Sequence, residues 1–292
     1  MKKITILSGK GGVGKSSIAA SLAVVLSKKH KIICADCDVD ASNLALVLGL
    51  KEKDFVEWKH MSTNQKAVFD LDKCKSCKEC FESCYFDAIA WQNNYPKLKE
   101  FGCEGCGLCK IICPHDAIKL VDVYNAKIGY GKTKYGFNIV SAQLEMGESG
   151  SGKIVAAVKE FAMKKEKADF MVIDAAAGIG CPVIASVTGS DYVIAVTEPT
   201  PSAFADLKRA LQMVNHFKIK SALIINKFDL NVNYSKKIEK FAEQKDIKVI
   251  AKLPYDKSFL NALVKLTPLV IYNENYWPIF QEIADTIKRE IF

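Results

Sequence analysis

The stretch "SGKGGVGKSS", residues 8–17, is a glycine-rich turn between a short apolar run, 3–7, and a segment with helical spacing, 16–27. It matches G-x-x-x-x-G-K-[ST], and after a strand and before a helix this pattern predicts a loop whose backbone N–H groups bind phosphate. The lysine of such a loop reaches the β- and γ-phosphates, and the next hydroxyl binds Mg²⁺. The candidate nucleotide-binding residues of the turn are Gly9, Lys10, Gly11, Gly12, Val13, Gly14, Lys15, Ser16 and Ser17.

Apolar runs typical of buried strands recur along the chain and alternate with helical segments. The predicted strands are 31–38, 169–180, 191–199, 219–229 and 246–254, and the predicted helices are 153–166, 202–216 and 233–245. This alternation favours a mostly parallel sheet with helices on both faces. The sequence therefore predicts an α/β fold of the P-loop NTPase type.

One stretch, from about Thr63 to Tyr124, interrupts this alternation. Within it, "CKSCKECFESCYFDAIAW" (74–91) and "CEGCGLCKIICPHDAIKL" (103–120) match at an offset of 29 residues. Such an internal repeat predicts a small inserted α+β domain. We expect residues 1–62 and 125–292 to form the nucleotide-binding domain and residues 63–124 the insert, with β-hairpins leading back from it.

The composition is that of a soluble globular protein. Of the 292 residues, 49% are hydrophobic and 25% charged, and no apolar run is long enough to cross a bilayer. The N-terminus does not read as a signal peptide, so we expect a cytoplasmic protein. The net charge of +8 is carried by lysines spread along the chain, which favours a solvated surface over a nucleic-acid partner.

Eight of the eleven cysteines lie in the two repeats, each with the spacing C-x₂-C-x₂-C-x₃-C. In a reducing compartment, such a block favours metal binding over disulfides. In bacterial ferredoxin runs, three cysteines bind one [4Fe-4S] cluster and the fourth binds the other cluster. Zinc, which four cysteines also bind, is the alternative. The predicted ligands are Cys74, Cys77, Cys80 and Cys113 for one [4Fe-4S] cluster, and Cys84, Cys103, Cys106 and Cys109 for the other.

The turn "KGGVGKSS" (10–17) resembles the deviant Walker A motif of the MinD/ParA family. With the cysteine repeats, the whole chain resembles the MinD-superfamily ATPases that carry an inserted ferredoxin domain. The segments 146–153, 178–186 and 196–211 resemble segments of the same subfamily. The resemblance implies that Lys10 reaches across a two-fold interface to the phosphates of the partner's ATP. ATP binding would then close a homodimer, with Lys10, Lys15 and Asp38 acting in hydrolysis.

Acidic residues follow two of the predicted strands. Asp174 ends one apolar run and is, with Ser16, a candidate Mg²⁺ ligand. The resemblance implies that Asp38 orients the attacking water and that Asp36 contacts Mg²⁺ in its outer sphere. Asp40 either contacts Mg²⁺ through water or caps the helix expected at 43–48, and we favour the cap.

The resemblance also implies an adenine-binding side. Asn226, in "INKFD", would hydrogen-bond the base, with Pro254 and Tyr255 beside it, although Asn226 could equally cap the end of its strand. Cys181 lies seven residues after Asp174, as does a cysteine that holds a bridging cluster in the nitrogenase iron protein. That protein supplies two cysteines per subunit, and 147–153 contains none, so we favour a packed side chain.

These features predict an ATP-hydrolysing iron–sulfur protein with ATP, Mg²⁺ and two [4Fe-4S] clusters as cofactors. Its ATP-gated homodimer would couple nucleotide state to electron transfer or to metal-cluster assembly on a partner protein. One alternative is a MinD/ParA-like spatial organiser, whose membrane helix would be 277–292; we expect its apolar stripe to pack on its own domain instead. Another is an iron–sulfur carrier scaffold, although no C-x-x-C follows Cys113.

Overall fold

The computed structural model describes residues 1–148 and 150–292 and divides the chain into two units. Unit 1 comprises Met1–Trp58, Ile128–Gln143 and Ser151–Phe292, and unit 2 comprises Lys59–Lys127 and Leu144–Gly150. Ser149, in the segment 146–153 that contributes to the resemblance, lies outside the described residues. Unit 2 therefore includes the predicted insert, 63–124, and a short returning segment.

The central sheet has the strand order β13-β12-β11-β1-β10-β2-β9-β8-β3. Neighbouring strands from β13 to β9 pair in parallel, as the buried apolar runs predict. The α/β fold with a mostly parallel sheet is confirmed. The strands are β1 (Lys2–Ser8), β2 (Ile32–Cys37), β3 (Phe55–Met61), β8 (Ala126–Lys132), β9 (Asn138–Leu144), β10 (Phe170–Ala177), β11 (Tyr192–Thr197), β12 (Ser221–Asn226) and β13 (Lys248–Leu253).

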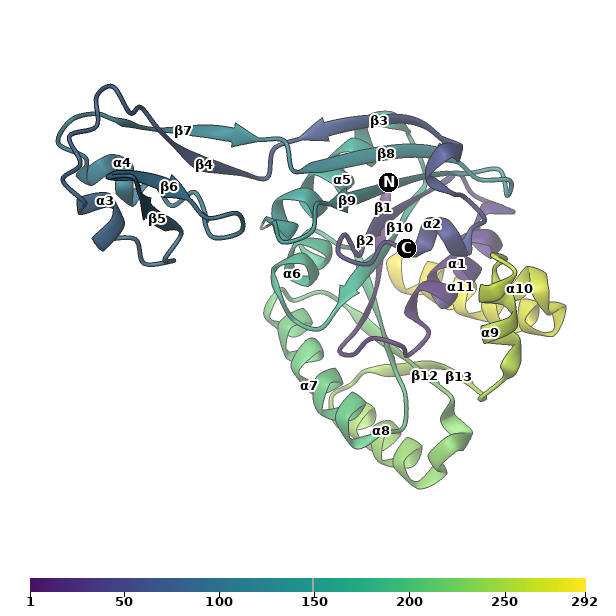
Figure 1. Ribbon diagram of the computed structural model, residues 1–292. Helices are drawn as coiled ribbons and strands as arrows, with labels where there is room; N and C mark the ends of the chain where they lie inside the picture. The colour runs from purple at the N-terminus through teal and green to yellow at the C-terminus, as the bar shows by residue number, and fades with distance from the viewer. Residues whose placement is uncertain (149) are drawn as a thin grey trace. The chain divides into compact units, whose positions relative to one another are not determined.

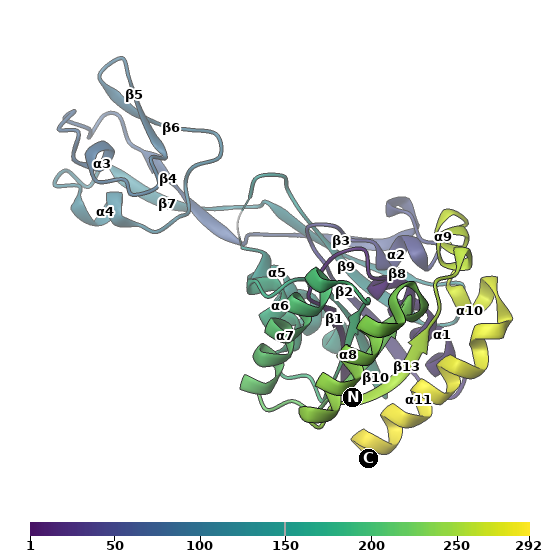
Figure 2. The same cartoon turned by 90° about the horizontal axis from the view of Figure 1, so that it is seen from below.

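Helices cover both faces of this sheet (Figures 1 and 2). One layer contains α1 (Lys15–Ser27), α10 (Leu269–Tyr272) and α11 (Trp277–Ile291). The other contains α5 (Ser151–Lys165), α6 (Cys181–Val187), α7 (Pro201–His216) and α8 (Val232–Gln244). Shorter pieces are α2 (Leu44–Val47), α9 (Lys257–Val264) and the 3₁₀ turns Glu52–Asp54, Phe228–Asn231 and Glu274–Tyr276.

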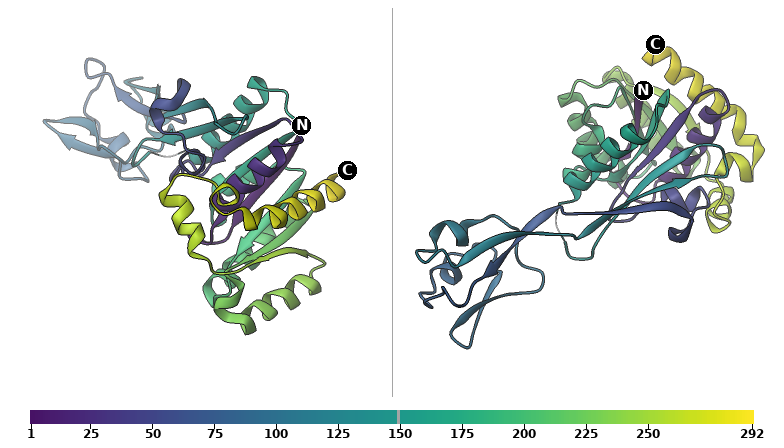
Figure 3. Two further views of the ribbon diagram at one scale, coloured as in Figure 1. Left: turned by 90° about the vertical axis from the view of Figure 1, so that its right-hand side faces the viewer. Right: turned by 90° about the horizontal axis from the view of Figure 1, so that it is seen from above.

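The apolar stripe of α11 packs on its own domain. Phe280, Ile283 and Ile287 are buried in the core that α11 shares with α1, and the two helices lie side by side in Figure 3. The expected packing of this stripe is confirmed. Within the described residues, no helix is long and apolar enough to span a membrane.

Unit 2 is built from two similar halves. The antiparallel pair β4 (Asn64–Phe69) and β7 (Ile118–Val123) accompanies a second antiparallel pair, β5 (Ile89–Gln92) and β6 (Tyr95–Leu98). Each cysteine run contains a short helix between its second and fourth cysteines, α3 (Glu79–Glu82) or α4 (Leu108–Ile112). The sequence repeat is therefore also a repeat of local structure.

Backbone torsions follow the repeat in detail. Ser76 and Lys78 have φ of 58° and 68°, and 29 residues later Gly105 and Gly107 have φ of 67° and 80°. Left-handed backbone suits glycine but strains other residues. The first cysteine loop thus has the same turn as the second but without glycines, which costs conformational free energy. Such backbone strain is common where a loop positions functional groups.

Candidate functional site

The predicted phosphate loop joins the carboxyl end of β1 to the amino end of α1. Gly14 has φ of 93°, and a Cβ there would lie 2.5 Å from Asn226 Nδ2. A Cβ on Gly9 would lie 2.4 Å from the backbone carbon of Asp206. Glycine is required at both motif positions because neighbouring elements approach the backbone closely.

Lys15 lies among the carboxylates that the sequence singles out. Its Nζ is 2.6 Å from Asp174 Oδ1 and 3.6 Å from Asp38 Oδ2, and its side chain is only 7% exposed. Burial acts to lower the pKa of Lys15, but the Asp174 and Asp38 carboxylates raise it above its ordinary value. The structure thus brings the P-loop lysine and the two acids together at one edge of the sheet.

Asp174 also has a carboxylate oxygen that is available to a magnesium ion. Among the described residues, its Oδ2 is a buried oxygen without a hydrogen-bond partner, an arrangement that is costly unless a ligand satisfies it. Ser16 follows Lys15 on the first turn of α1. The donor set of a hydroxyl and carboxylates fits Mg²⁺, which prefers oxygen ligands and retains several waters.

Asp36 is fully buried and organises the segment after β2. Its Oδ2 accepts hydrogen bonds from Ser42 Oγ (3.1 Å), the Leu44 N–H (3.0 Å) and Ser141 Oγ (3.5 Å). Burial, followed by the charge of Asp174, raises the pKa of Asp36 to about 7. The charge of Lys15 and the hydrogen bond from Ser42 oppose this rise in the pKa of Asp36, and a bound cation would favour the anionic carboxylate further.

The preferred role of Asp40 as a helix cap is wrong. Asn43 occupies the N-cap position of α2, and Asp36 accepts the N–H of Leu44, the first residue of that helix. Asp36 lies earlier in the chain, but β2 ends next to α2, so its buried carboxylate reaches the helix start. Spacing along the sequence could not reveal this contact.

Lys10 makes contacts within its own chain. Its Nζ is 3.7 Å from Glu198 Oε1 and donates to Ser202 Oγ at 3.4 Å, and its side chain is 43% exposed. Glu198 also pairs with Lys227 at 2.8 Å, and Lys227 donates to the Gly12 carbonyl at 3.1 Å. Sequence reasoning missed Glu198 and Lys227, although Glu198 lies near the end of the predicted strand 191–199 and directly follows β11.

The predicted adenine residues lie near the same loop. Asn226 Nδ2 donates to the Val13 carbonyl at 2.8 Å, and its Oδ1 accepts the Lys227 N–H at 3.0 Å. Tyr255 follows Pro254 after β13, and its N–H donates to Asp229 at 2.7 Å. In this structure Asn226 supports the phosphate loop, and contact with the base remains a prediction for Asn226, Pro254 and Tyr255.

The eight repeat cysteines gather into two groups in unit 2. One small cavity is lined by Cys74, Cys77, Cys80 and Cys113, and a second by Cys84, Cys103, Cys106 and Cys109. Each group combines three cysteines of one run with the last cysteine of the other. These are the groupings expected from the ferredoxin spacing.

Backbone N–H groups also donate to the last cysteine of each run, the one that joins the group of the other run. The Ala88 N–H donates to Cys84 Sγ at 3.3 Å, and the Ala117 N–H donates to Cys113 Sγ at 3.5 Å. Hydrogen bonds to cysteine sulfur are among the features that tune iron–sulfur clusters. Within the described chain, no three His, Cys, Asp or Glu side chains converge on a point that suits a single metal ion; a cubane differs in that each thiolate binds its own iron.

The remaining cysteines lie in unit 1. Cys34 and Cys37 are buried in β2, and burial raises the pKa of the Cys37 thiol to about 12. Cys181, at the start of α6, is exposed, so the expectation of a packed side chain is wrong. It lies beside Gly152, the second residue of α5.

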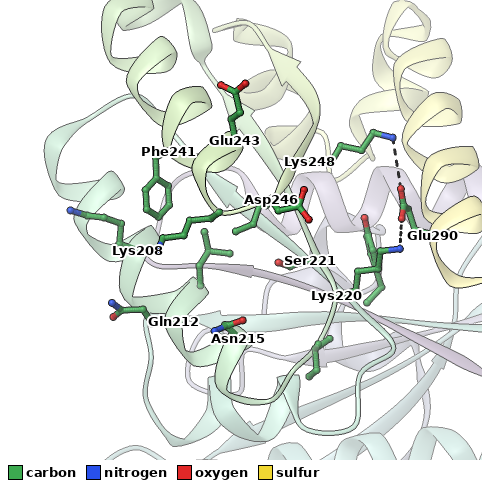
Figure 4. A pocket seen from close by; sticks show the side chains of 15 residues that line it. Lys208, Gln212, Asn215, Lys220, Ser221, Phe241, Glu243, Asp246, Lys248 and Glu290 are labelled. Carbon is green, nitrogen blue, oxygen red and sulfur yellow. Dashed lines mark ion pairs between the residues drawn. The ribbon is translucent and has the colours of Figure 1, made fainter.

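A cavity of about 800 Å³ lies elsewhere in unit 1 (Figure 4). Tyr192, Ser221 and Lys248, the first residues of β11, β12 and β13, line it. Glu290 pairs there with Lys220 at 2.5 Å and with Lys248 at 3.8 Å. The phosphate loop follows the opposite, carboxyl end of β1, which is where ligands bind in open parallel sheets.

Comparisons with known proteins agree with the fold and the loop. An uncharacterised Methanocaldococcus jannaschii protein is 41% identical over 238 residues, covering 81% of this chain and 82% of the relative. The iron–sulfur cluster carrier protein of Pyrococcus abyssi is 23% identical over 305 residues, with 99% and 86% covered. The structure of the septum site-determining protein MinD with Mg-ADP from Pyrococcus horikoshii matches with a TM-score of 0.62 and 18% identity, covering 99% of this chain and 96% of that one.

The family of CobQ/CobB/MinD/ParA nucleotide-binding domains matches residues 4–269. The match includes the phosphate loop, Asp174 and the cysteine repeats, and it spans most of the chain. Together with the parallel sheet and the lysine–carboxylate site, it shows that this chain belongs to the CobQ/CobB/MinD/ParA family of P-loop nucleotide-binding proteins.

Proposed function

We propose that this protein is an ATPase that couples its nucleotide state to electron transfer, or to cluster assembly, on a partner protein. The observation that carries this proposal is the gathering of eight cysteines into two groups of four, in a chain that also has a complete P-loop site. Two [4Fe-4S] clusters held by these cysteines would supply one-electron chemistry.

The ATPase site assigns a role to each side chain. Lys15 would leave Asp174 for the β- and γ-phosphates, and the Ser16 hydroxyl with the carboxylates of Asp174 and Asp36 would hold Mg²⁺, which would supply positive charge at the phosphates. Asp38, 3.6 Å from Lys15 in this structure, orients the water that attacks the γ-phosphorus in line. The bond from the γ-phosphorus to ADP would break as the bond to the water oxygen forms, and the proton of the water would pass to an oxygen of the released phosphate.

Lys10 would make hydrolysis depend on assembly. An ammonium group that moves from Glu198 to a partner's phosphates adds positive charge only when two chains meet, as an arginine finger does. The nucleotide would therefore control a homodimer. Docking and reduction of the partner protein would then depend on whether the homodimer has formed.

Anaerobic EPR of the reduced protein, with ADP or a non-hydrolysable ATP analogue, tests this proposal alongside iron content. We expect about eight irons per chain, from two [4Fe-4S] clusters, and a spectrum or midpoint potential that shifts when the analogue replaces ADP. Full iron loading without any nucleotide response would contradict coupling. In that event the clusters would be structural or sensing groups.

A second candidate is an iron–sulfur cluster carrier, which the 23% identical P. abyssi relative favours by its name. A carrier must release its cluster. Incubation of the iron-loaded protein with an apo-acceptor, with and without ATP, distinguishes the two functions. Iron retained on this chain supports electron transfer, whereas ATP-dependent movement of iron to the acceptor supports the carrier.

A further inference from the structure

The two halves of unit 2 differ in the side chains that surround their cysteine groups. The second cysteine group consists of Cys84, Cys103, Cys106 and Cys109. Around it, four large apolar side chains are exposed: Tyr85 and Ile111, at 89% and 81%, and also Phe86 and Leu108. Single exposed apolar residues are common on protein surfaces, but a contiguous apolar patch marks an interaction site.

These four side chains form one patch, the apolar rim. Tyr85, Phe86 and Leu108 line the cavity of the second cysteine group. The rings of Tyr85 and Phe86 pack edge to face, with their centroids 5.4 Å apart. Leu108 and Ile111 are three residues apart on α4 and therefore share one face of that helix. Cys106 is itself exposed, so the apolar rim borders a part of the cysteine group that is open to solvent.

The first half of unit 2 is an internal reference for the apolar rim. At an offset of 29 residues, the positions equivalent to Tyr85, Phe86, Leu108 and Ile111 hold Pro114, His115, Glu79 and Glu82. His115 and Glu79 line the cavity of the first cysteine group. The shared backbone of the repeat therefore accepts charged and polar side chains at these positions, and holding four cysteines does not require an apolar rim.

The apolar rim is suited to a transient partner that carries little charge at its contact surface. Glu104 is the one acid or base among the described residues that line the second cavity, and Lys110 does not share the helix face of its neighbour Ile111. Stable interfaces bury about 1,600 Å² in total, whereas electron-transfer encounters bury less than about 1,200 Å². Aromatic side chains bury about 150–250 Å² each, so four partly exposed side chains provide the smaller kind of contact.

We propose that the apolar rim is the docking surface for a redox protein that presents an uncharged, apolar surface over its own redox centre. This inference rests on the proposed function and deepens it, since it gives the chemistry of the partner and the part of unit 2 that binds it. In the complex, one electron would leave the cluster of the second cysteine group and reduce the partner's centre by one electron, without transfer of a proton.

Docking can be measured without electron transfer. The probe is azurin, a small blue-copper protein with an apolar surface over its metal, prepared with zinc in place of copper and labelled with ¹⁵N. We expect the iron-loaded wild type to shift or broaden the amide resonances of that surface in an NMR titration. Leu108→Gln with Ile111→Gln should abolish this effect. Val68→Gln with Val121→Gln, at exposed apolar residues of β4 and β7, is the matched control and should retain it.

Stopped-flow reduction of copper azurin by the reduced protein, freed of excess reductant, gives a second readout. The Leu108→Gln, Ile111→Gln variant should have a second-order rate constant at least about tenfold below that of the wild type, with iron content and EPR spectrum unchanged. If that variant loses iron, Ile111→Gln alone, at the more exposed of the two side chains, replaces it in both measurements.

Equal resonance shifts and equal rates in the wild type and the Leu108→Gln, Ile111→Gln variant would overturn the proposal, and so would a wild type that leaves the azurin resonances unchanged. A wild-type dimer with ADP that this variant abolishes in sedimentation would assign the apolar rim to a second copy, which also overturns it. Docking at the rim together with an EPR signal that ignores nucleotide would reject the coupling in the proposed function and leave the docking surface standing.

Discussion

Lys15 pairs with carboxylates in this structure, and it would pair with phosphates when a nucleotide binds. Its ammonium group compensates Asp174 and Asp38 in a buried site, and removal of one partner from such a site leaves unpaired charge. Lys15 therefore serves folding of the nucleotide-free protein as well as phosphate binding.

Replacement of Lys15 separates these two roles. We expect Lys15→Ala to abolish ATP binding and to lower the free energy of unfolding by about 3–5 kcal/mol, measured by urea denaturation without nucleotide. Lys15→Ala with Asp174→Ala should be less destabilised than the sum of the single variants. Lys10→Ala, at an exposed pair, should lose less than about 1 kcal/mol; equal losses at Lys10 and Lys15 would contradict this account.

Asp256 supports the loop that includes Pro254 and Tyr255. It caps α9 by accepting the Ser258 N–H at 2.7 Å and also accepts the Tyr276 hydroxyl at 2.8 Å. The Ser258 N–H is the main cause that lowers the pKa of Asp256 below its ordinary value, and burial opposes it. A carboxylate with a lowered pKa stabilises the fold above its unfolded-state pKa, and that contribution is lost as pH falls through the folded-state pKa.

Asp256→Ala should therefore cost about 1 kcal/mol of unfolding free energy at pH 7. The difference from the wild type should narrow as pH falls below about 4, where the carboxyl group becomes protonated. Urea denaturation at several pH values measures this. Asp256→Asn keeps an N-cap that does not titrate, so its difference from Asp256→Ala should not vary with pH. A constant difference between wild type and Asp256→Ala would refute the assignment.

At the scale of elements, the two glycines of the second cysteine loop differ in how closely neighbouring residues approach them. A Cβ on Gly105 would lie 2.3 Å from the Gln65 carbonyl oxygen of β4, whereas a Cβ on Gly107 would be 3.4 Å from Leu120. Both glycines have positive φ, so alanine at either position is strained. Gly105→Ala adds a collision with backbone that cannot move without shifting β4.

We expect Gly105→Ala to lose the cluster of Cys84, Cys103, Cys106 and Cys109, and hence about half of the bound iron, while the other cluster remains. Gly107→Ala is the matched control and should keep nearly all of it. Iron content with EPR spin quantification gives both answers. Full iron content in Gly105→Ala would show that β4 shifts to accept the added Cβ at little cost. Equal iron losses in both variants would show that the positive φ, and not the contact with β4, determines cluster loss.

The first and second cysteine loops differ in charge at equivalent positions. Lys75 and Lys78 line the first cysteine cavity, and Glu104 and Gly107 occupy the matching places at the second. Positive charge favours an added electron, so the first site should have the higher midpoint potential. Lys75→Glu should lower the higher potential and Glu104→Lys should raise the lower one, in EPR-monitored redox titrations. Lys53→Glu, in unit 1, controls for net charge; shifts as large in that variant would refute a local effect.

The elements that the sequence could predict are those whose pattern is local. The buried strands, the phosphate loop and the four long helices after it follow from apolar periodicity and glycine positions. β3 was not predicted, because its residues alternate only partly in burial. The contacts of Glu198 with Lys10 and of Lys159 with α6 join segments that are far apart in the sequence, so spacing along the chain could not reveal them.

At the scale of the whole molecule, Lys10 is suited to exchange partners because its contacts within the chain are weak. Its ion pair with Glu198 is long and partly exposed, and such pairs contribute between 0 and about 1 kcal/mol. Glu198 keeps Lys227 as a second partner at 2.8 Å. Departure of Lys10 to another chain would therefore leave no buried charge behind.

The proposed dimer can be tested on this residue alone. In analytical ultracentrifugation we expect the wild type to sediment as a monomer with ADP and as a dimer with a non-hydrolysable ATP analogue. Lys10→Ala should bind the analogue, because Lys15 remains, yet stay a monomer and hydrolyse ATP more slowly. Lys2→Ala, which removes a comparable exposed pair with Asp191 at the opposite end of β1, should dimerise normally. Dimerisation of Lys10→Ala at wild-type concentrations would show that ATP assembles the protein without this lysine, and the charge that completes the site would then have to come from within the same chain.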